Sequence, residues 1–167
     1  MVTLVVLWTD ISESLKFIQT SDQAWRLALF QVFETVRWFG RSAKDVAAHR
    51  GQSKVEKVDV ETVIKMIGFP LDLSKPESGK YEDDKWIRMI LEYKFDQHNL
   101  GVITADSEID DDACRILCLV AGRTLDMTFL EAKLEAEREG STSIRWIEAR
   151  HIIRGCERLP YPLDWLC

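Results

Sequence analysis

Carboxylates that follow short apolar stretches are the residues of this chain whose types and spacing could do chemistry. Asp10 follows the apolar run LVVLW, Asp106 follows GVIT, and Asp84 opens a helical pattern that leads into GVIT. Carboxylates gathered at the ends of parallel strands repel one another unless a cation neutralises them, and their hard oxygen ligands favour Mg²⁺ or Mn²⁺. Such an ion activates water and stabilises a reacting phosphate, so the pattern predicts a metal-dependent nuclease site.

The same acids have a second interpretation that needs no metal. Acidic side chains at helix N-termini accept hydrogen bonds from the first N–H groups and complement the helix dipole. Asp10, Asp84 and Asp106 each stand where a helix is expected to begin. Helix capping alone would explain all three, and the sequence leaves both interpretations open.

The stretch DDKWIRMILEYKFDQHNLGVITADSEI, residues 83–109, has an acid that opens a helix, then a hydrophobic strand with a T-x-D ending. In these features it resembles the PIN-domain ribonucleases. The resemblance implies a Mg²⁺- or Mn²⁺-dependent ribonuclease that acts on single-stranded RNA. It also implies that Asp84 and Asp106 are two of the catalytic, metal-binding acids and that Glu108 is an outer acid.

The first acid of that family stands directly at the end of the first strand, followed by Thr or Ser. Here Trp8 occupies that place and Asp10 follows two positions later, so Asp10 would act from a shifted position. For the acid that the family carries in a middle helix, Glu61 and Glu34 are both candidates.

One region of the chain is clearly basic. Between residues 37 and 57 it contains seven basic residues and few acids, namely Arg37, Arg41, Lys44, His49, Arg50, Lys54 and Lys57. In a nuclease this region would guide RNA, and Arg41, Lys44 and Arg50 are the predicted substrate-binding residues. The alternative is a solvated helix end followed by a loop, where basic side chains are favourable without any ligand.

The expected strands alternate with expected helices along the chain, and this pattern predicts an α/β fold. In such a fold the ends of the strands would position these acids. We expect a single helix-rich domain over residues 1–167 with a small, mostly parallel sheet; an all-α bundle is the alternative. Residues 143–148 could be a strand or the first turn of a last helix. The other expected strands are 2–8, 54–59 and GVIT. The expected helices are one capped by Asp10 or Ser12 that runs through about Gln19, one beginning after Thr20 or Ser21, and those at 61–67, 81–97, 109–122 and 124–139.

The composition narrows the functional classes. The formal charge of −6 argues against generic nucleic-acid binding, although a local basic patch could still serve. No apolar run is long enough to span a membrane and no secretory signal is recognisable, so a cytoplasmic protein with free, buried thiols is expected. The rival to the nuclease is a non-catalytic interaction module, such as an adaptor, inhibitor or immunity-type protein, whose acidic surface meets a basic partner.

Overall fold

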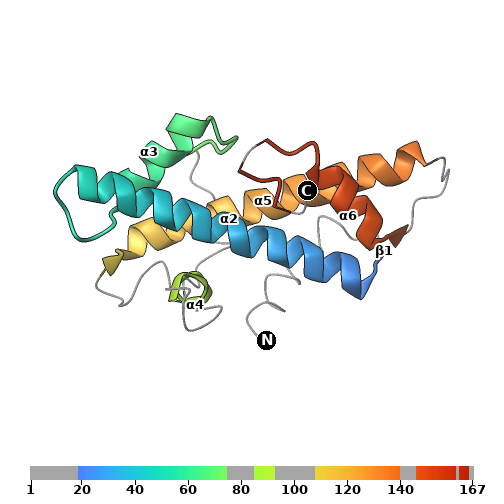
Figure 1. Ribbon diagram of the computed structural model, residues 1–167, viewed down its shortest axis with the longest axis horizontal. Coiled ribbons are helices and arrows are strands. Elements are labelled where there is room, and N and C mark those ends of the chain that lie inside the picture. The colour runs from blue at the N-terminus through green and yellow to red at the C-terminus, as the bar shows by residue number, and fades with distance from the viewer. Residues whose placement is uncertain (1–18, 75–84, 93–107, 140–145, 161, 166–167) are drawn as a thin grey trace. The chain divides into compact units, whose positions relative to one another are not determined.

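The computed structural model describes residues 19–74, 85–92, 108–139, 146–160 and 162–165 of the chain. The described residues are mostly helical (Figure 1). The elements are β1 (Gln19–Thr20), α2 (Asp22–His49), α3 (Lys57–Ile67), α4 (Lys85–Glu92), α5 (Asp111–Arg138), β2 (Trp146–Ile147) and α6 (Ala149–Cys156).

The described extended segments are too short to form the predicted sheet. β1 pairs in parallel with β2 over two residues, Gln19 with Trp146 and Thr20 with Ile147. A single bridge joins Val55 to Ile109. The described residues therefore fit the all-α alternative and give no support to a parallel sheet, while the strands expected at 2–8 and in GVIT lie outside them.

The chain divides into two compact units. The central unit is Val36–Arg123, and the terminal unit combines Met1–Thr35 with Thr124–Cys167. The helices α2 and α5 contribute residues to both units. The single domain expected over residues 1–167 stays a prediction.

The start of α2 follows the sequence pattern. The Ser21 hydroxyl oxygen accepts a hydrogen bond from the backbone N–H of Ala24 at 3.1 Å, so Ser21 is the N-cap. The helix continues to His49 because its buried face extends beyond Phe39 through Ala43 and Ala47. Most of the basic region is therefore helix.

The strand predicted at residues 54–59 is wrong, because α3 begins at Lys57. The side chain of Asp59 accepts a hydrogen bond from the backbone N–H of Glu56 at 2.8 Å, which stabilises a helix start where the sequence shows loosely alternating valines. The predicted stop is confirmed, since Gly68 has a φ of +65°, a left-handed conformation that suits glycine at a helix C-terminus.

The two helices predicted at residues 109–122 and 124–139 form one helix, α5. A glycine inside a helix costs only about 1 kcal/mol relative to alanine, so Gly122 does not have to end it. The buried face continues through this point, with Leu117, Ala121 and Leu125 at four-residue spacing. Burial of that face outweighs the local signal for a break.

Three further expectations concern stretches at the ends of the described ranges. Residues 146–147 are a strand and α6 begins at Ala149, so the undecided stretch 143–148 ends as a strand that leads into a helix. The helix expected at 81–97 is represented by α4, and its remaining residues lie outside the described ranges. Of the helix expected to run from the Asp10 or Ser12 cap through about Gln19, Gln19 alone is described, and it belongs to β1.

Each unit has its own apolar core. In the central unit Phe39 meets Phe69 edge to face with ring centroids 5.1 Å apart, and in the terminal unit Trp25 lies 5.2 Å from Phe129. Cys114, Cys118 and Cys156 are free and buried, which confirms the expectation for these three thiols. None of the helices in the described ranges combines the length and apolar character of a membrane crossing.

Candidate functional site

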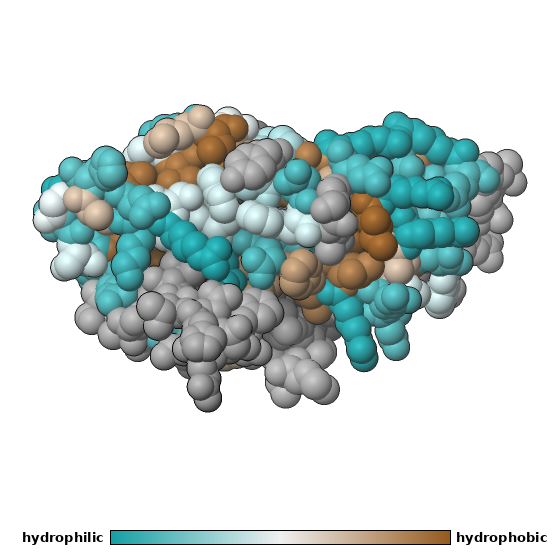
Figure 2. Space-filling model, viewed as in Figure 1, coloured by the Kyte–Doolittle hydropathy of each residue, from teal (hydrophilic) through white to brown (hydrophobic). Residues whose placement is uncertain are grey.

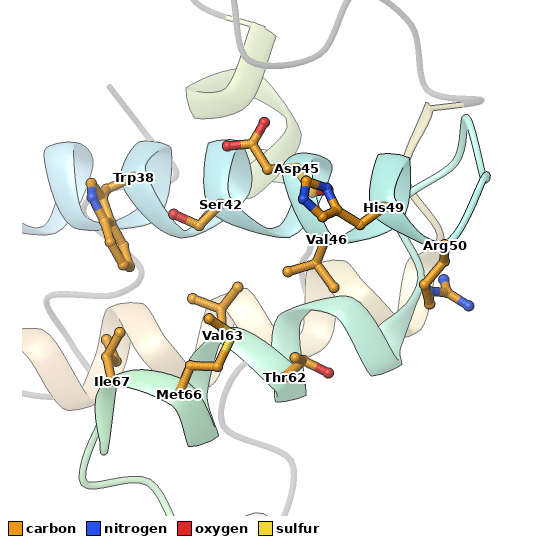
Figure 3. Close-up of a pocket in the computed structure, with 10 residues that line it drawn as sticks. All are labelled: Trp38, Ser42, Asp45, Val46, His49, Arg50, Thr62, Val63, Met66 and Ile67. Carbon is orange, nitrogen blue, oxygen red and sulfur yellow. The ribbon is translucent and has the colours of Figure 1, made fainter.

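An open pocket of about 560 Å³ lies between α2 and α3 in the central unit (Figure 3). This volume is in the range of pockets that bind ligands or anchor the side chains of a partner. Its lining comes from two helices, with Trp38, Ser42, Asp45, Val46 and His49 on α2, Arg50 just after α2, and Thr62, Val63, Met66 and Ile67 on α3. We call this pocket the α2–α3 groove.

Helical spacing places the lining residues of each helix on one stripe. Trp38, Ser42 and Val46 recur at four-residue steps along α2, and Thr62 and Met66 do so along α3. Figure 3 shows the side chains of Trp38, Val46 and Val63 in the space between the two helices. The groove therefore has an apolar floor bordered by the hydroxyl groups of Ser42 and Thr62.

On α3 one apolar side chain that lines the groove is exposed to water, and so is another on the same stripe outside the lining. Met66 is 74% exposed, and Val58, two turns earlier on the same stripe of α3, is 45% exposed. Hydrophobic surface is visible over α3 in the space-filling view (Figure 2). Single exposed apolar residues are ordinary, but exposed residues beside an apolar pocket are typical of binding surfaces.

The end of the groove is fixed by Arg50. Its guanidinium donates hydrogen bonds to both carboxylate oxygens of Asp59, at 2.7 and 2.8 Å, and a third to Glu56 at 2.9 Å. The hydrogen bonds to Asp59, followed by those to Glu56, raise the pKa of Arg50 above its ordinary value. Arg50 therefore links the chain after α2 to the first turn of α3.

The predicted RNA-binding residues differ in their surroundings. Lys44 is ion-paired with Glu108, with 3.3 Å between Nζ and Oε2, and Arg50 is held by Asp59 and Glu56. Arg41 is exposed on α2. The positive charges of Lys44 and Arg50 are therefore compensated by carboxylates, whereas that of Arg41 faces solvent.

The predicted metal-binding acids, Asp10, Asp84 and Asp106, lie outside the described residues. Within the described ranges no group of three or more His, Cys, Asp or Glu side chains is arranged to hold a metal ion. Glu108, the outer acid that the resemblance implies, pairs with Lys44. Of the two candidates for the middle-helix acid, Glu61 forms an ion pair with Lys57, with 3.5 Å between Oε1 and Nζ. Glu34 is half-buried on α2.

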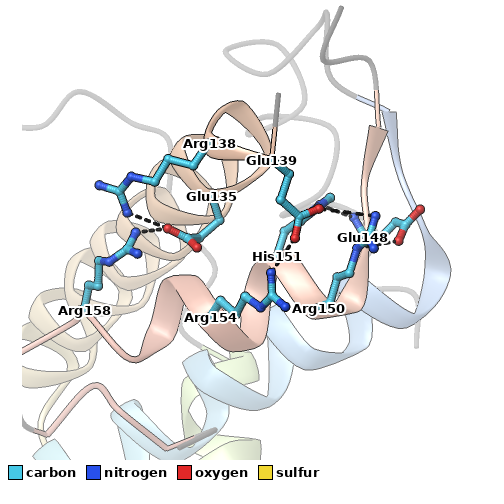
Figure 4. Close-up of polar contacts among 8 residues, drawn as sticks. All are labelled: Glu135, Arg138, Glu139, Glu148, Arg150, His151, Arg154 and Arg158. Carbon is cyan, nitrogen blue, oxygen red and sulfur yellow. Dashed lines mark hydrogen bonds and ion pairs between the residues drawn. The ribbon is translucent and has the colours of Figure 1, made fainter. Parts of the chain in front are cut away.

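A second polar cluster joins α6 to the end of α5 in the terminal unit (Figure 4). Glu135 is paired with Arg138 and Arg158, and Glu139 is paired with Arg150, His151 and Arg154. The acids and bases of this cluster satisfy one another, and Glu135 is buried. Such a cluster of ion pairs holds the two helices together.

His151 has a defined tautomer in this cluster. Its Nδ1 accepts a hydrogen bond from the backbone N–H of Glu148 at 3.0 Å, so the ring proton of the neutral imidazole is on Nε2. Nε2 therefore donates to Glu139, 3.1 Å away. This hydrogen bond is the main cause that lowers the pKa of Glu139, and Arg150 and Arg154 add to the effect.

The α2–α3 groove was missed by the sequence analysis, although a signal for it was present. Val58 and Met66 are exposed apolar residues two helical turns apart on α3, with Thr62 between them, and they lie beside the buried Val60, Val63 and Ile64. A short helix with two apolar faces can bury one in the core and offer the other to a partner.

No protein-family model matches the chain, and no curated protein or solved structure is significantly similar to it. The resemblance of residues 83–109 to PIN-domain ribonucleases stays a prediction.

Proposed function

We propose that the protein is a non-catalytic interaction module that binds a segment of a partner protein in the α2–α3 groove. The observation that supports this function is the apolar groove itself, bordered by Met66 with 74% of its surface exposed. Covering apolar surface contributes roughly 25 cal/mol for each Å² removed from water, so a partner that fills the groove gains binding energy.

The shape and chemistry of the groove favour a peptide segment over a small polar substrate. Two neighbouring helices that present apolar stripes form the kind of surface into which an amphipathic helix inserts its own apolar face. Met66 adds an unbranched, polarisable side chain that adapts to different partner side chains. The guanidinium of Arg50 is held by Asp59 and Glu56, so its charge is already compensated and does not favour an anionic small molecule in the groove.

The ribonuclease remains the alternative function. It would use Asp10, Asp84 and Asp106 with Mg²⁺ or Mn²⁺, and Arg41, Lys44 and Arg50 for single-stranded RNA. The interaction module is preferred because the groove offers an apolar surface to a partner, and because Lys44 and Arg50, two of the three predicted RNA contacts, are already paired with carboxylates.

Binding of designed peptides tests the proposed function. The probes are fluorescein-labelled amphipathic helices with leucines at three- and four-residue steps, and fluorescence anisotropy measures their dissociation constants. The variant Met66→Asp places a charge on the wall of the groove, and Met89→Asp is its matched control because Met89 is 59% exposed on α4 and is not among the lining residues.

We expect wild type and Met89→Asp to bind at least one such peptide with equal affinity. Met66→Asp should weaken that binding at least tenfold, which corresponds to about 1.4 kcal/mol. Failure of the wild type to bind any amphipathic peptide, or an equal loss in both variants, would contradict the proposed function.

A further inference from the structure

Two helices of this chain begin with the same arrangement of side chain and backbone. In α3 the backbone N–H of Glu56 donates to the carboxylate of Asp59 at 2.8 Å, and in α6 the backbone N–H of Glu148 donates to Nδ1 of His151 at 3.0 Å. The backbone conformation is nearly the same at both glutamates, with φ of −109° and −102° and ψ of 164°. The two helix starts differ in the acceptor, which is a carboxylate in α3 and an imidazole in α6.

An imidazole accepts a hydrogen bond at Nδ1 only while it is neutral. In the imidazolium both ring nitrogens are donors, so a protonated His151 would turn an N–H toward the N–H of Glu148. An ordinary histidine gains its proton near about pH 6.5, whereas an ordinary aspartate does so only near about pH 4. Mild acid therefore removes the acceptor at the start of α6 and leaves the one at the start of α3.

The charged groups around His151 act on its other ring nitrogen. Nε2 donates to Glu139 of α5, 3.1 Å away, and it can do so in both protonation states. Glu139 favours a positive imidazole, while Arg150 and Arg154 of α6, which also pair with Glu139, oppose it. The remaining ion pairs of the cluster join Glu135 to Arg138 and Arg158, and Arg150 to Glu148 (Figure 4). In the described part of the chain no ion pair links α2 to His151 or Glu139. Protonation thus keeps the contact with Glu139 and breaks the one with the backbone of Glu148.

The hydrogen bond to Nδ1 lies directly beside the paired strands. Glu148 follows β2 in the chain, and the carbonyl oxygen of Ile147 accepts the backbone N–H of Ser21 at 2.9 Å. β1 and β2 pair over only two residues each. We call residues 19–21 and 146–148 the β1–β2 clasp. Because few hydrogen bonds hold such a short pairing, it belongs to the kind of segment that opens locally at low cost in free energy.

We propose that His151 makes the β1–β2 clasp sensitive to pH, because a proton that binds Nδ1 releases the backbone N–H of Glu148 and opens the clasp. One proton moves from solvent to Nδ1 and one hydrogen bond breaks, with no change in covalent bonds. The proton and the N–H compete for the same lone pair, so falling pH shifts the population toward the open clasp. This inference is independent of the α2–α3 groove, whose residues belong to the central unit.

Amide hydrogen exchange measured by NMR tests the clasp. The protection factor of the Glu148 N–H, which corrects for the intrinsic effect of pH on exchange, is compared at about pH 7.5 and about pH 5.5, on either side of the ordinary titration of histidine. The N–H of Glu56 is the internal control, since its acceptor is a carboxylate. His151→Asn offers a neutral oxygen acceptor that does not titrate. His49→Asn is the matched control because His49 is exposed on α2.

We expect the protection of the Glu148 N–H to fall at least tenfold at the lower pH in the wild type and in His49→Asn. The protection of the Glu56 N–H should stay constant in both. In His151→Asn the protection of Glu148 should be the same at the two pH values.

Constant protection of Glu148 in the wild type would overturn the inference, and so would a fall that persists in His151→Asn. An equal fall at Glu56 would show a general loss of structure in place of an opening at the clasp. The ¹⁵N signals of the His151 ring give a second measurement that needs no substitution. Nδ1 should gain its proton over the same pH range in which Glu148 loses protection, and a protonated Nδ1 beside a fully protected Glu148 would contradict the competition for one lone pair.

Discussion

The guanidinium of Arg50 donates hydrogen bonds to both carboxylate oxygens of Asp59, from Nε to Oδ1 at 2.7 Å and from Nη2 to Oδ2 at 2.8 Å. Asp59 is fully buried, and its Oδ2 also accepts the backbone N–H of Glu56. Because Arg50 directly follows α2 and Asp59 is in the first turn of α3, this pair holds the two helices that form the α2–α3 groove.

Substitution of Asp59 tests the importance of this pair. Asp59→Asn keeps the volume but loses the charge that Arg50 binds, so the free energy of unfolding should fall by about 1–3 kcal/mol. Urea denaturation measures the change, and Asp45→Asn is the control, since Asp45 is an exposed acid on the neighbouring helix. Equal effects of the two substitutions would show that the pair with Arg50 adds nothing specific.

The hydrogen bond and ion pairs of Glu139 should make the free energy of unfolding depend on pH. The pKa of Glu139 is lowered from its ordinary value of 4.5 by the hydrogen bond from His151 and by Arg150 and Arg154. A lowered folded-state pKa contributes stability above pH 4.5, and this contribution is lost as the pH falls below 4.5 through the folded-state value.

Glu139→Gln should therefore be less stable than the wild type at pH 7, and the difference should shrink toward pH 3, conditions that bracket the titration of ordinary carboxyl groups. Urea denaturation at both pH values measures it. Glu137→Gln is the matched control because Glu137 is exposed two positions away. A difference for Glu139→Gln that stays constant over this range would contradict the assigned ion pairs.

At Gly155 the backbone of α6 lies tightly against the backbone of α5. A Cβ atom at this position would lie 2.8 Å from the backbone nitrogen of Ala132 and 2.9 Å from the carbonyl carbon of Glu131. In an isolated helix Gly→Ala is stabilising, but here the added methyl meets backbone atoms that cannot move aside. Gly155→Ala should therefore lower the free energy of unfolding by about 1–3 kcal/mol. An increase in the thermal midpoint would show that the two helices are not in this contact.

Metal binding separates the interaction module from the predicted ribonuclease. If Asp84 and Asp106 cap helices, addition of Mn²⁺ should leave the thermal unfolding midpoint of the wild type unchanged, as in Asp84→Asn and Asp106→Asn. A rise in the midpoint of the wild type that both substitutions remove would favour a shared cation site, because a ligand that binds the folded state stabilises it. Cleavage of single-stranded RNA should then be measured.

Features set by neighbouring residues could be predicted from the sequence. The cap at Ser21 and the stop at Gly68 each depend on a few adjacent residues. The continuity of α5 through Gly122 depends on burial along the whole helix, and the start of α3 depends on Asp59, which is held by Arg50 from another element. Local propensity does not report such contacts.

The candidate site could be predicted only in part. The basic region was visible in the sequence, but the carboxylates that compensate Lys44 and Arg50 come from residues 6 to 64 positions away. The groove exists because α3 lies beside α2, and periodicity alone could not show which helix would be its neighbour. The exposed stripe of Val58, Thr62 and Met66 was the one local signal for it.

The most direct test of the α2–α3 groove is a methyl NMR titration. The chain has four methionines, so ¹³C labelling of their methyl groups gives few signals, and single Met→Leu variants assign them. An amphipathic peptide with leucines at three- and four-residue steps is added to saturation. The account predicts that the Met66 signal shifts while the signal of Met89, which is exposed on α4, stays in place. An unchanged Met66 signal at saturation would contradict binding in the groove.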